Sequence, residues 1–212
     1  MQIFGYLATA IGAYLLGSIP TGFLVAKARG IDIRSVGSGN IGATNVFRAL
    51  GKPAGIFVLL IDGLKGYAAC EWLAELVHQS ILGGGTDKEI LKILGGLCGV
   101  LGHNYTCWLK FKGGKGIATS AGALAALVPW ALLIILAIWI VVFAITRYVS
   151  LASIAASFTL PFATWATGGS LTLILVTAAM TVLAIYKHKA NIQRLLSGTE
   201  SRLGSKKREA TS

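Results

Sequence analysis

A polar, glycine-rich segment interrupts the apolar sequence early in the chain and ends in an arginine. It covers residues 37–48 and reads GSGNIGATNVFR. Glycines let the backbone turn tightly and expose its N–H groups, and the hydroxyl and amide side chains add further donors. Such donors beside a guanidinium suit an anion, above all a phosphate. The alternative, a plain loop with a helix cap, does not need so many donors. The candidate binding residues are Gly37, Ser38, Gly39, Asn40, Thr44, Asn45 and Arg48.

Lysines and glycines make up most of a second segment, residues 110–116, which reads KFKGGKG and leads directly into an apolar stretch. Helix N-termini favour anions because their first N–H groups are unpaired and the helix dipole is positive there. The GxxxxGK[ST] spacing of a nucleotide P-loop is absent, so we predict a simpler phosphate site. A positively charged membrane anchor with a turn is the alternative. The candidate binding residues are Lys112, Gly113, Gly114, Lys115 and Gly116.

The third polar segment, residues 186–200, lies near the C-terminus and reads YKHKANIQRLLSGTE. At helical spacing His188 and Asn191 share one face and point to a common site. The alternative is a basic helix at the membrane surface that binds anionic lipid headgroups. That alternative accounts for the lysines, but it accounts less well for His188, Asn191 and Glu200.

Three further ionisable residues fall within or at the end of apolar segments. Asp62 and Lys65 are three residues apart and share a helical face, and ionisable groups at membrane depth usually pair or line a polar cavity. We assign the two a structural ion pair in preference to direct catalysis, and we assign His103 a polar, site-shaping role. The three cysteines have no paired-ligand spacing, and we expect neither a metal nor a cofactor.

The elements that must position these segments are membrane helices. Hydrophobic residues make up 55% of the 212 residues and charged residues only 13%, whereas soluble domains carry about 25% charged residues. Uncharged runs of roughly 18 or more apolar residues indicate membrane spans. We interpret the first such block, residues 3–26, as a retained span and not as a cleaved signal peptide. The net charge of +11 fits basic cytoplasmic loops better than it fits nucleic-acid binding.

The predicted fold is therefore all-α: a polytopic helical membrane protein with about seven transmembrane helices. The first three spans are residues 3–26, 53–77 and 91–109. Residues 117–186 make four short spans or include half-helices, with breaks at Pro129, at Arg147 and at residues 168–170. With the N-terminus outside and the C-terminus inside, every basic cluster lies on the cytoplasmic side. Residues 1–212 form one integral-membrane domain, and residues 203–212 are predicted to be a disordered basic tail.

Together the three polar segments resemble the signature motifs of the bacterial acyl-phosphate:glycerol-3-phosphate acyltransferases, the PlsY-type membrane enzymes. The matching stretches are GSGNIGATNVFR, LGHNYTCWLKFKGGKGIAT and KHKANIQRLLSGTE, with IDGLKG between the first two. They follow the family's order and extend over residues 37–200. Ile41 stands where the family commonly has proline, and Thr106-Cys107 stands where it usually has an apolar pair. Neither difference affects a proposed catalytic group.

The resemblance implies a multi-pass enzyme of the bacterial inner membrane with its active site facing the cytoplasm. The implied reaction transfers a fatty acyl group from acyl phosphate to the sn-1 hydroxyl of glycerol 3-phosphate. It gives lysophosphatidic acid and inorganic phosphate, in the first acylation of phospholipid synthesis. The implied partners are these substrates, membrane lipid and the enzyme that makes acyl phosphate, without an obligate complex. The implied catalytic residues are Ser38, Arg48, Lys115, His188 and Asn191, with Glu200 in a supporting position.

Acyl phosphate is an activated mixed anhydride, so positioning and charge neutralisation can supply much of the catalysis. Two phosphate-bearing substrates would explain two anion-binding turns, and we expect glycerol 3-phosphate at residues 110–116. Either His188 acts as general base, or the donor's phosphate takes the proton and His188 only orients the hydroxyl. The rival hypotheses are a transporter of phosphate esters and a non-catalytic lipid-binding scaffold. A transporter should have repeated halves, and the sequence contains no such repeat.

Overall fold

The first apolar block forms two helices that meet at a proline. α1 covers Gln2–Ser18 and α2 covers Thr21–Lys27. Pro20 lies between them, and because proline has no N–H it cannot continue the hydrogen-bond ladder of α1. The whole stretch Gln2–Lys27 is long and apolar enough to cross a membrane. This computed structural model describes residues 1–85 and 87–204.

All the regular structure of the described residues is helical, as predicted. A π-helical turn, Ala68–Trp72, joins α4 to α5, and short 3₁₀ turns cover Ile33–Ser35 and Cys107–Leu109. The remaining helices are α3 Ala43–Leu50, α4 Lys52–Tyr67, α5 Leu73–Ser80, α6 Lys88–Asn104, α7 Ile117–Leu127, α8 Pro129–Thr146, α9 Val149–Ala166, α10 Leu171–Lys187 and α11 Lys189–Leu196.

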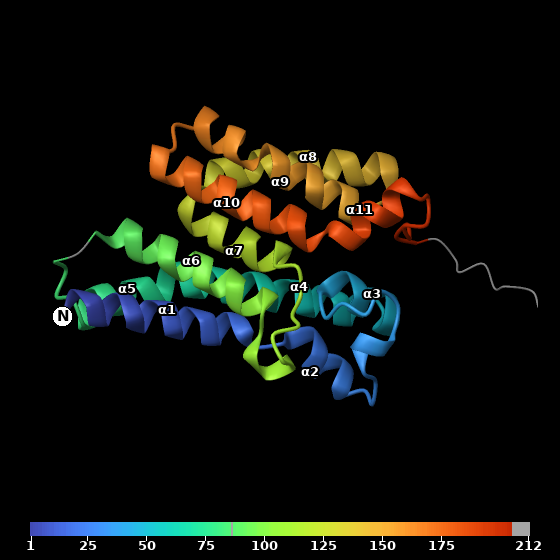
Figure 1. The fold of residues 1–212 in the computed structure, drawn as a ribbon, viewed down its shortest axis with the longest axis horizontal. Coiled ribbons are helices and arrows are strands. Elements are labelled where there is room, and N and C mark those ends of the chain that lie inside the picture. Colours follow the sequence, from blue (N-terminus) through green and yellow to red (C-terminus); the bar gives the residue numbers. More distant parts are fainter. Residues whose placement is uncertain (86, 205–212) are drawn as a thin grey trace, which may run out of the picture.

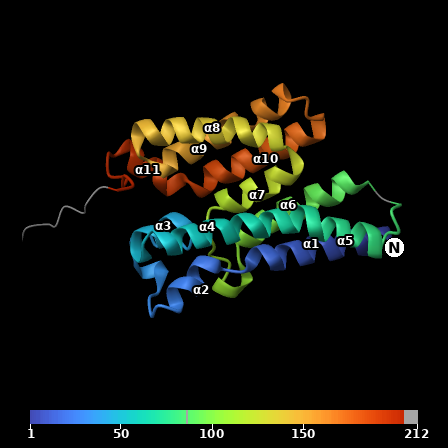
Figure 2. The ribbon, with the colours of Figure 1, turned by 180° about the vertical axis from the view of Figure 1, so that it is seen from behind.

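The long helices form two groups with α7 between them (Figures 1 and 2). One group consists of α8, α9 and α10, and the other consists of α1, α4, α5 and α6. α7 packs on α4 and α6 on one side and on α8 and α10 on the other. The short helices α2, α3 and α11 all lie at the end of the bundle opposite the N-terminus (Figure 1). This end therefore gathers the polar segments that are far apart in the sequence.

Glycines allow α7 to lie very close to α4. A Cβ atom on Gly66 would be 2.0 Å from the carbonyl oxygen of Thr119, and one on Gly122 would be 1.9 Å from that of Gly63. No side chain fits at such distances, and small residues are what bring membrane helices into close contact. The contact holds α7, and the loop that precedes it, against the face of α4 that carries Asp62.

The number of membrane spans agrees only in part with the prediction of about seven. Among the described helices, four are long and apolar enough to span a membrane, or five if α10 and α11, which meet at 58°, form one broken span. The four are Gln2–Lys27, Lys52–Ser80, Pro129–Thr146 and Val149–Ala166. α7 has 11 residues. Its length is about 16 Å, roughly half the thickness of a hydrocarbon core. α7 therefore fits the half-helix alternative, and seven full spans stay a prediction.

The three breaks predicted within residues 117–186 are confirmed. α8 begins at Pro129, and Arg147 ends it in a left-handed conformation with φ 61°. Ser170 caps α10 by accepting a hydrogen bond from the N–H of Leu173. This region is thus four consecutive helices, α7 to α10.

The prediction for the third span, residues 91–109, is wrong at its C-terminal end because α6 ends at Asn104. The carbonyls of His103 and Asn104 accept hydrogen bonds from the N–H groups of Gly114 (3.0 Å) and Gly113 (3.2 Å). The last carbonyls of a helix have no partner within the helix, and these two hydrogen bonds supply partners for the carbonyls of His103 and Asn104. The residues after Asn104 thus form a loop that returns to the end of its own helix.

The two described ends of the chain lie at opposite ends of the bundle (Figure 1). The N–H of Leu203 donates to the Arg147 carbonyl at 2.9 Å, at the end that carries α11. Opposite ends are what an odd number of passes produces. Of the tail predicted over residues 203–212, residues 205–212 lie outside the described part of the chain.

Candidate active site

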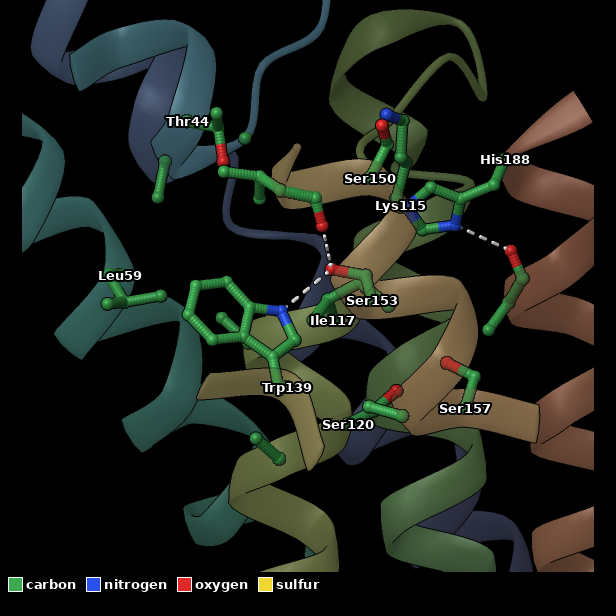
Figure 3. Close-up of a pocket in the computed structure, with 18 of the residues that line it drawn as sticks. Thr44, Leu59, Lys115, Ile117, Ser120, Trp139, Ser150, Ser153, Ser157 and His188 are labelled. Atoms are coloured by element: carbon green, nitrogen blue, oxygen red, sulfur yellow. Dashed lines mark hydrogen bonds between the residues drawn. The ribbon is translucent and has the colours of Figure 1, made fainter. Parts of the chain in front are cut away.

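A cavity of about 480 Å³ lies between the two helix groups, and its lining changes character along its length. One end is lined by polar and charged side chains from α3 and the loop before it, the loop before α7, and α11. The other end is lined mainly by apolar side chains of α7 to α10. Figure 3 shows Ile117 and Trp139 among them, together with serines of α7 and α9. One space can therefore receive a charged group and an apolar chain at the same time.

The loop before α3 is shaped by one buried amide. Asn45 is 2% exposed, and its Nδ2 donates to the carbonyls of Val36 and Asn40, both at 2.9 Å. Its Oδ1 accepts the N–H of Ser38 at 3.0 Å. A buried amide with fixed partners holds the backbone around it in one conformation. Asn45 therefore presents Ser38 at the cavity wall, and its own hydrogen-bonding groups are occupied.

Arg48 reaches the cavity from the last turn of α3. Its Nη2 donates to the carbonyl of Ser201 at 2.9 Å, which joins the first polar segment to the C-terminal one. Burial lowers the pKa of Arg48 from its usual value, although the carboxylate of Glu200 opposes this effect. Arginine nevertheless stays protonated in proteins, so its other N–H groups can bind an anion.

The loop of residues 110–116, called the glycine loop from here on, ends at the N-terminus of α7. Gly116 is the N-cap residue and has φ 80°, a conformation that strains any residue with a side chain. Gly116, Ile117 and Ala118 line the cavity. The first N–H groups of α7, which have no partner within the helix, therefore lie at the cavity wall. This arrangement suits a phosphate.

Lys115 connects the glycine loop to the C-terminal segment through a hydrogen-bond network. Its Nζ donates to Asn191 Oδ1 at 2.6 Å, and Asn191 Nδ2 donates to Glu200 Oε1 at 2.8 Å. Ser150 Oγ donates to the same oxygen at 2.8 Å, and Arg194 Nε donates to Oε2 at 2.6 Å. Burial alone would raise the pKa of Glu200, but these hydrogen bonds hold it below its usual value. The carboxylate thus stays charged and fixes Asn191.

The polar end carries more positive than negative charge. Burial is the main cause that lowers the pKa of Lys115 to about 8. The carboxylate of Glu200 opposes the shift, whereas Arg194 and Arg48 add to it. Neighbouring cations that repel one another make a strong site for a dianion, because the dianion relieves their repulsion.

His188 lies where α10 ends and is 2% exposed. Its Nδ1 is 2.8 Å from the carbonyl oxygen of Ala184. A carbonyl can only accept, so Nδ1 carries the proton and Nε2 keeps its lone pair. Figure 3 shows the His188 ring beside Lys115. Nε2 is therefore able to accept a hydrogen bond or a proton from a hydroxyl group.

The cavity brings together most of the predicted site residues. Those that line it are Ser38, Asn40, Thr44, Asn45, Arg48, Lys115, Gly116, His188 and Asn191, together with Asp62, His103 and Glu200 from the supporting set. Those outside its lining are Gly37, Gly39, Lys112, Gly113, Gly114 and Lys65. Gly113 and Gly114 shape the glycine loop through their backbone, and Lys112 is exposed on its outer side.

The predicted structural ion pair is present. Lys65 Nζ lies 2.8 Å from Asp62 Oδ1, and both side chains are less than 5% exposed. His103 is also buried, with its Nδ1 3.7 Å from the same carboxylate oxygen. Asp62 and His103 line the cavity, whereas Lys65 lies behind them and outside its lining.

Sequence reasoning did not identify Ser150, Ser153 and Trp139. Ser150 lies in the first turn of α9 and donates a hydrogen bond to Glu200. Trp139 Nε1 donates to Ser153 Oγ at 3.1 Å, and both residues line the apolar part of the cavity (Figure 3). The break at Arg147 was a usable signal for Ser150, because it places Ser150 at the polar end. Nothing in the sequence marks the other two.

The cavity also has an apolar opening between α4 and α8. Ile56 and Leu59 of α4 and Leu136 of α8 line the cavity, yet they are 50%, 50% and 46% exposed. A residue that lines a cavity and faces outward must lie at its mouth. These residues are apolar and belong to helices that are long and apolar enough to span a membrane, so the opening is lined by apolar side chains.

Sequence comparisons match nearly the whole chain to one family of known proteins. A family model for glycerol-3-phosphate acyltransferase matches residues 7–198. The glycerol-3-phosphate acyltransferase of Clostridioides difficile (strain 630) is 46% identical, over 98% of this chain and 100% of its own length. The corresponding protein of Geotalea daltonii is 47% identical, over 90% of this chain and 94% of its own length.

Two solved structures are also similar to this chain over most of its length. A crystal structure of PlsY, an integral membrane glycerol 3-phosphate acyltransferase, in its glycerol 3-phosphate form has a TM-score of 0.83 and 42% identity. The match covers 94% of this chain and 96% of that one. The lysophosphatidic acid form of PlsY has a TM-score of 0.80 and 41% identity, over 94% and 95% of the two chains. With the matched motifs and the shared fold, this chain belongs to the glycerol-3-phosphate acyltransferase family.

Proposed function

We propose that this protein transfers a fatty acyl group from acyl phosphate to the sn-1 hydroxyl of glycerol 3-phosphate. The products are lysophosphatidic acid and inorganic phosphate. The observation that carries the proposal is the single cavity that joins a cationic end to an apolar groove with a lipid-facing mouth. The names of the relatives, and the ligand forms of the solved PlsY structures, support the acceptor and the product.

The phosphate of glycerol 3-phosphate binds at the glycine loop in this proposal. The unpaired N–H groups at the start of α7 and the ammonium of Lys115 supply donors of the right charge. The phosphate of the acyl donor lies toward Ser38 and Arg48, where a second set of donors faces the cavity. Lys115 thus binds the phosphate of glycerol 3-phosphate and Arg48 binds the phosphate of the acyl donor. The hydroxyl group and the acyl carbonyl carbon lie between these two phosphates.

The reaction is a direct acyl transfer. The sn-1 oxygen attacks the acyl carbonyl carbon, the bond between that carbon and the phosphate oxygen breaks, and phosphate leaves with the bonding electrons. The hydroxyl proton passes to His188 Nε2 or to the departing phosphate. In both routes His188 contacts the hydroxyl, and fixed cations stabilise the developing charge.

The acyl chain enters sideways from the membrane. The mouth at Ile56, Leu59 and Leu136 lets the chain slide in without crossing water. The activated phosphate then reaches the cationic end while the chain stays in the apolar groove. A coenzyme A donor is disfavoured, because the His-x4-Asp pattern of many CoA-linked acyltransferases is absent from the sequence.

The polar end faces the cytoplasm of a bacterial cell, and the protein resides in the inner membrane with its N-terminus outside. Basic residues support this orientation: Lys27, Arg48, Lys110 and Lys187 belong to the segments at the polar end, and cytoplasmic loops are rich in lysine and arginine. The enzyme that makes acyl phosphate works on the same side, without an obligate complex.

The purified protein in detergent provides the test. Palmitoyl phosphate and radiolabelled glycerol 3-phosphate should give labelled lysophosphatidic acid without soluble partners, and palmitoyl-CoA should not replace the donor. Comparable turnover with palmitoyl-CoA would overturn the donor assignment. No product with either donor, together with exchange of labelled glycerol 3-phosphate across proteoliposomes, would favour a transporter instead.

A further inference from the structure

The buried ion pair of α4 contacts two other parts of the bundle. Lys65 Nζ lies 2.8 Å from Asp62 Oδ1 and also donates to the carbonyl of Ile19 at 2.9 Å, at the bend between α1 and α2. The same Asp62 oxygen lies 3.7 Å from His103 Nδ1, in the last turn of α6, a close polar contact that is longer than a hydrogen bond. The pair therefore links α4 to the bend after α1 and to the end of α6.

His103 in turn supports the glycine loop. Its carbonyl oxygen accepts the N–H of Gly114 at 3.0 Å. A Cβ atom on Gly114 would lie 2.1 Å from His103 Nε2, so the loop backbone lies directly against the imidazole ring. Gly114 precedes Lys115, whose Nζ donates to Asn191 at 2.6 Å. A small shift of the ring would thus move the backbone that carries Lys115.

Burial of two charges in a membrane helix is costly, so stability alone does not account for the pair. Paired charges of this kind can often be replaced by apolar residues without loss of stability. Polar and ionisable groups inside membrane proteins mark functional positions. Asp62 and His103 line the same cavity as Lys115, which places the pair beside the site and not in a remote part of the core.

We propose that Asp62, Lys65 and His103 are positioning residues for the phosphate site. The ion pair fixes the Asp62 carboxylate beside the His103 ring, the ring packs against Gly114, and Gly114 sets the position of Lys115 and of the N–H groups at the start of α7. The three residues act through the glycine loop and do not touch the reacting atoms. This inference rests on the proposed function, in which the glycine loop binds the phosphate of glycerol 3-phosphate.

The sharpest test replaces the ion pair by apolar residues of similar size, in the double variant Asp62→Leu/Lys65→Met. No unpaired charge remains, so the helix bundle is expected to fold. We expect KM for glycerol 3-phosphate to rise about tenfold with kcat changed less than about threefold, because bound phosphate itself contacts Lys115 and the start of α7 and restores their position. Amide hydrogen exchange in the peptide containing residues 110–116 should become faster in the substrate-free protein. Wild-type KM and wild-type exchange would overturn the proposal.

A second variant, His103→Phe, leaves the ion pair in place and keeps a ring beneath Gly114. It removes Nδ1 and with it the polar contact to Asp62. KM for glycerol 3-phosphate should rise and amide exchange in residues 110–116 should become faster, but both changes should be smaller than in the double variant. If the double variant does not fold, this variant decides the matter. Wild-type KM and wild-type exchange in His103→Phe would then overturn the proposal.

A control variant and Lys115→Ala distinguish the positioning role of the ion pair from the phosphate-binding role of the glycine loop. Glu75→Gln/Lys88→Gln removes an ion pair at the far end of α6, and it should leave KM and the exchange of residues 110–116 unchanged. If Lys115→Ala has wild-type KM, the proposed function of the loop fails, while the exchange data still decide whether the ion pair holds the loop. If Lys115→Ala raises KM and both positioning variants behave as wild type, only the positioning role fails.

Discussion

The two ends of the cavity hold their side chains in different ways. At the polar end hydrogen bonds fix several of the charged and amide groups, as in the contacts from Lys115 to Asn191 and from Asn191 to Glu200. At the apolar end the lining comes from residues such as Leu124, Leu160 and Met180, whose positions depend on packing alone. The side mouth adds exposed apolar residues of α4 and α8.

The difference follows from the chemistry that each end must perform. A phosphate is recognised by donors at defined distances, so a displacement of about 1 Å at the polar end is costly for catalysis. An acyl chain has no directional groups and requires only an apolar surface of sufficient size. We therefore expect substitutions at the polar end to have large effects on rate or KM and substitutions in the groove to change mainly which chains are used.

The largest effect should come from His188→Ala. Removal of Nε2 leaves the attacking hydroxyl without its acceptor, and kcat should fall by about 10²-fold to 10⁴-fold if His188 takes the proton. A fall of only about tenfold would mean that the departing phosphate takes it and that His188 orients the hydroxyl. KM for glycerol 3-phosphate should change little in both cases. Steady-state kinetics with palmitoyl phosphate provide the measurement.

His78→Ala is the matched control for this prediction, because His78 lies in α5, outside the cavity lining. It should keep wild-type kcat. An unchanged kcat in a folded His188→Ala protein would show that His188 is only a structural residue of the α10–α11 bend.

Lys115→Ala should have the next largest effect. Loss of a charge-assisted hydrogen bond costs about 1.5–3 kcal/mol, which corresponds to a fall in kcat/KM of about 10-fold to 150-fold. A raised KM alone would indicate binding of ground-state phosphate, and a lowered kcat would indicate additional stabilisation of the transition state. Lys112→Ala is the matched control, because this lysine of the same loop is exposed and lies outside the cavity lining. Equal effects of the two substitutions would contradict a specific phosphate site.

The apolar end should respond to Ala156→Leu with a moderate, chain-dependent loss. Ala156 lines the groove, six residues along α9 from Ser150 and so about 9 Å away from the polar end. The larger side chain should lower kcat/KM for palmitoyl phosphate by about tenfold, lower it less for octanoyl phosphate, and leave KM for glycerol 3-phosphate unchanged. Ala155→Leu, the same change one residue away and outside the lining, is the control. A loss equal for both chain lengths would show that the acyl chain lies elsewhere.

The smallest expected effect is a pH dependence of a few-fold. Burial lowers the pKa of Lys115 to about 8, so the side chain is charged below that pH and becomes neutral above it. KM for glycerol 3-phosphate should therefore rise a few-fold as the pH increases from 7 to 8.5. Lys115→Arg keeps its charge over this range, and its KM should stay flat even if its absolute value differs. A flat KM in the wild type would mean that the ammonium of Lys115 is not needed for binding.

The sequence by itself determined the class of fold and the composition of the site. Uncharged blocks of about 20 residues form helices in a membrane, because only a helix pairs every backbone N–H and C=O within one such segment. The three polar segments carry donors and cations whose types already indicate phosphate, and the breaks at Pro129 and Arg147 follow from local backbone chemistry. These properties are local, and local properties can be derived from neighbouring residues.

Only the tertiary structure decided how the segments cooperate. Lys115, Asn191, Glu200 and Ser150 form one network although they come from three distant parts of the chain. α6 ends at Asn104, earlier than predicted, where its last carbonyls accept hydrogen bonds from Gly113 and Gly114. No helical pattern in the sequence reveals these bonds. The cavity and its side mouth exist only where α4, α7, α8 and α9 face one another. Contacts between distant segments depend on the packing of whole helices, and that packing is a property of the folded chain.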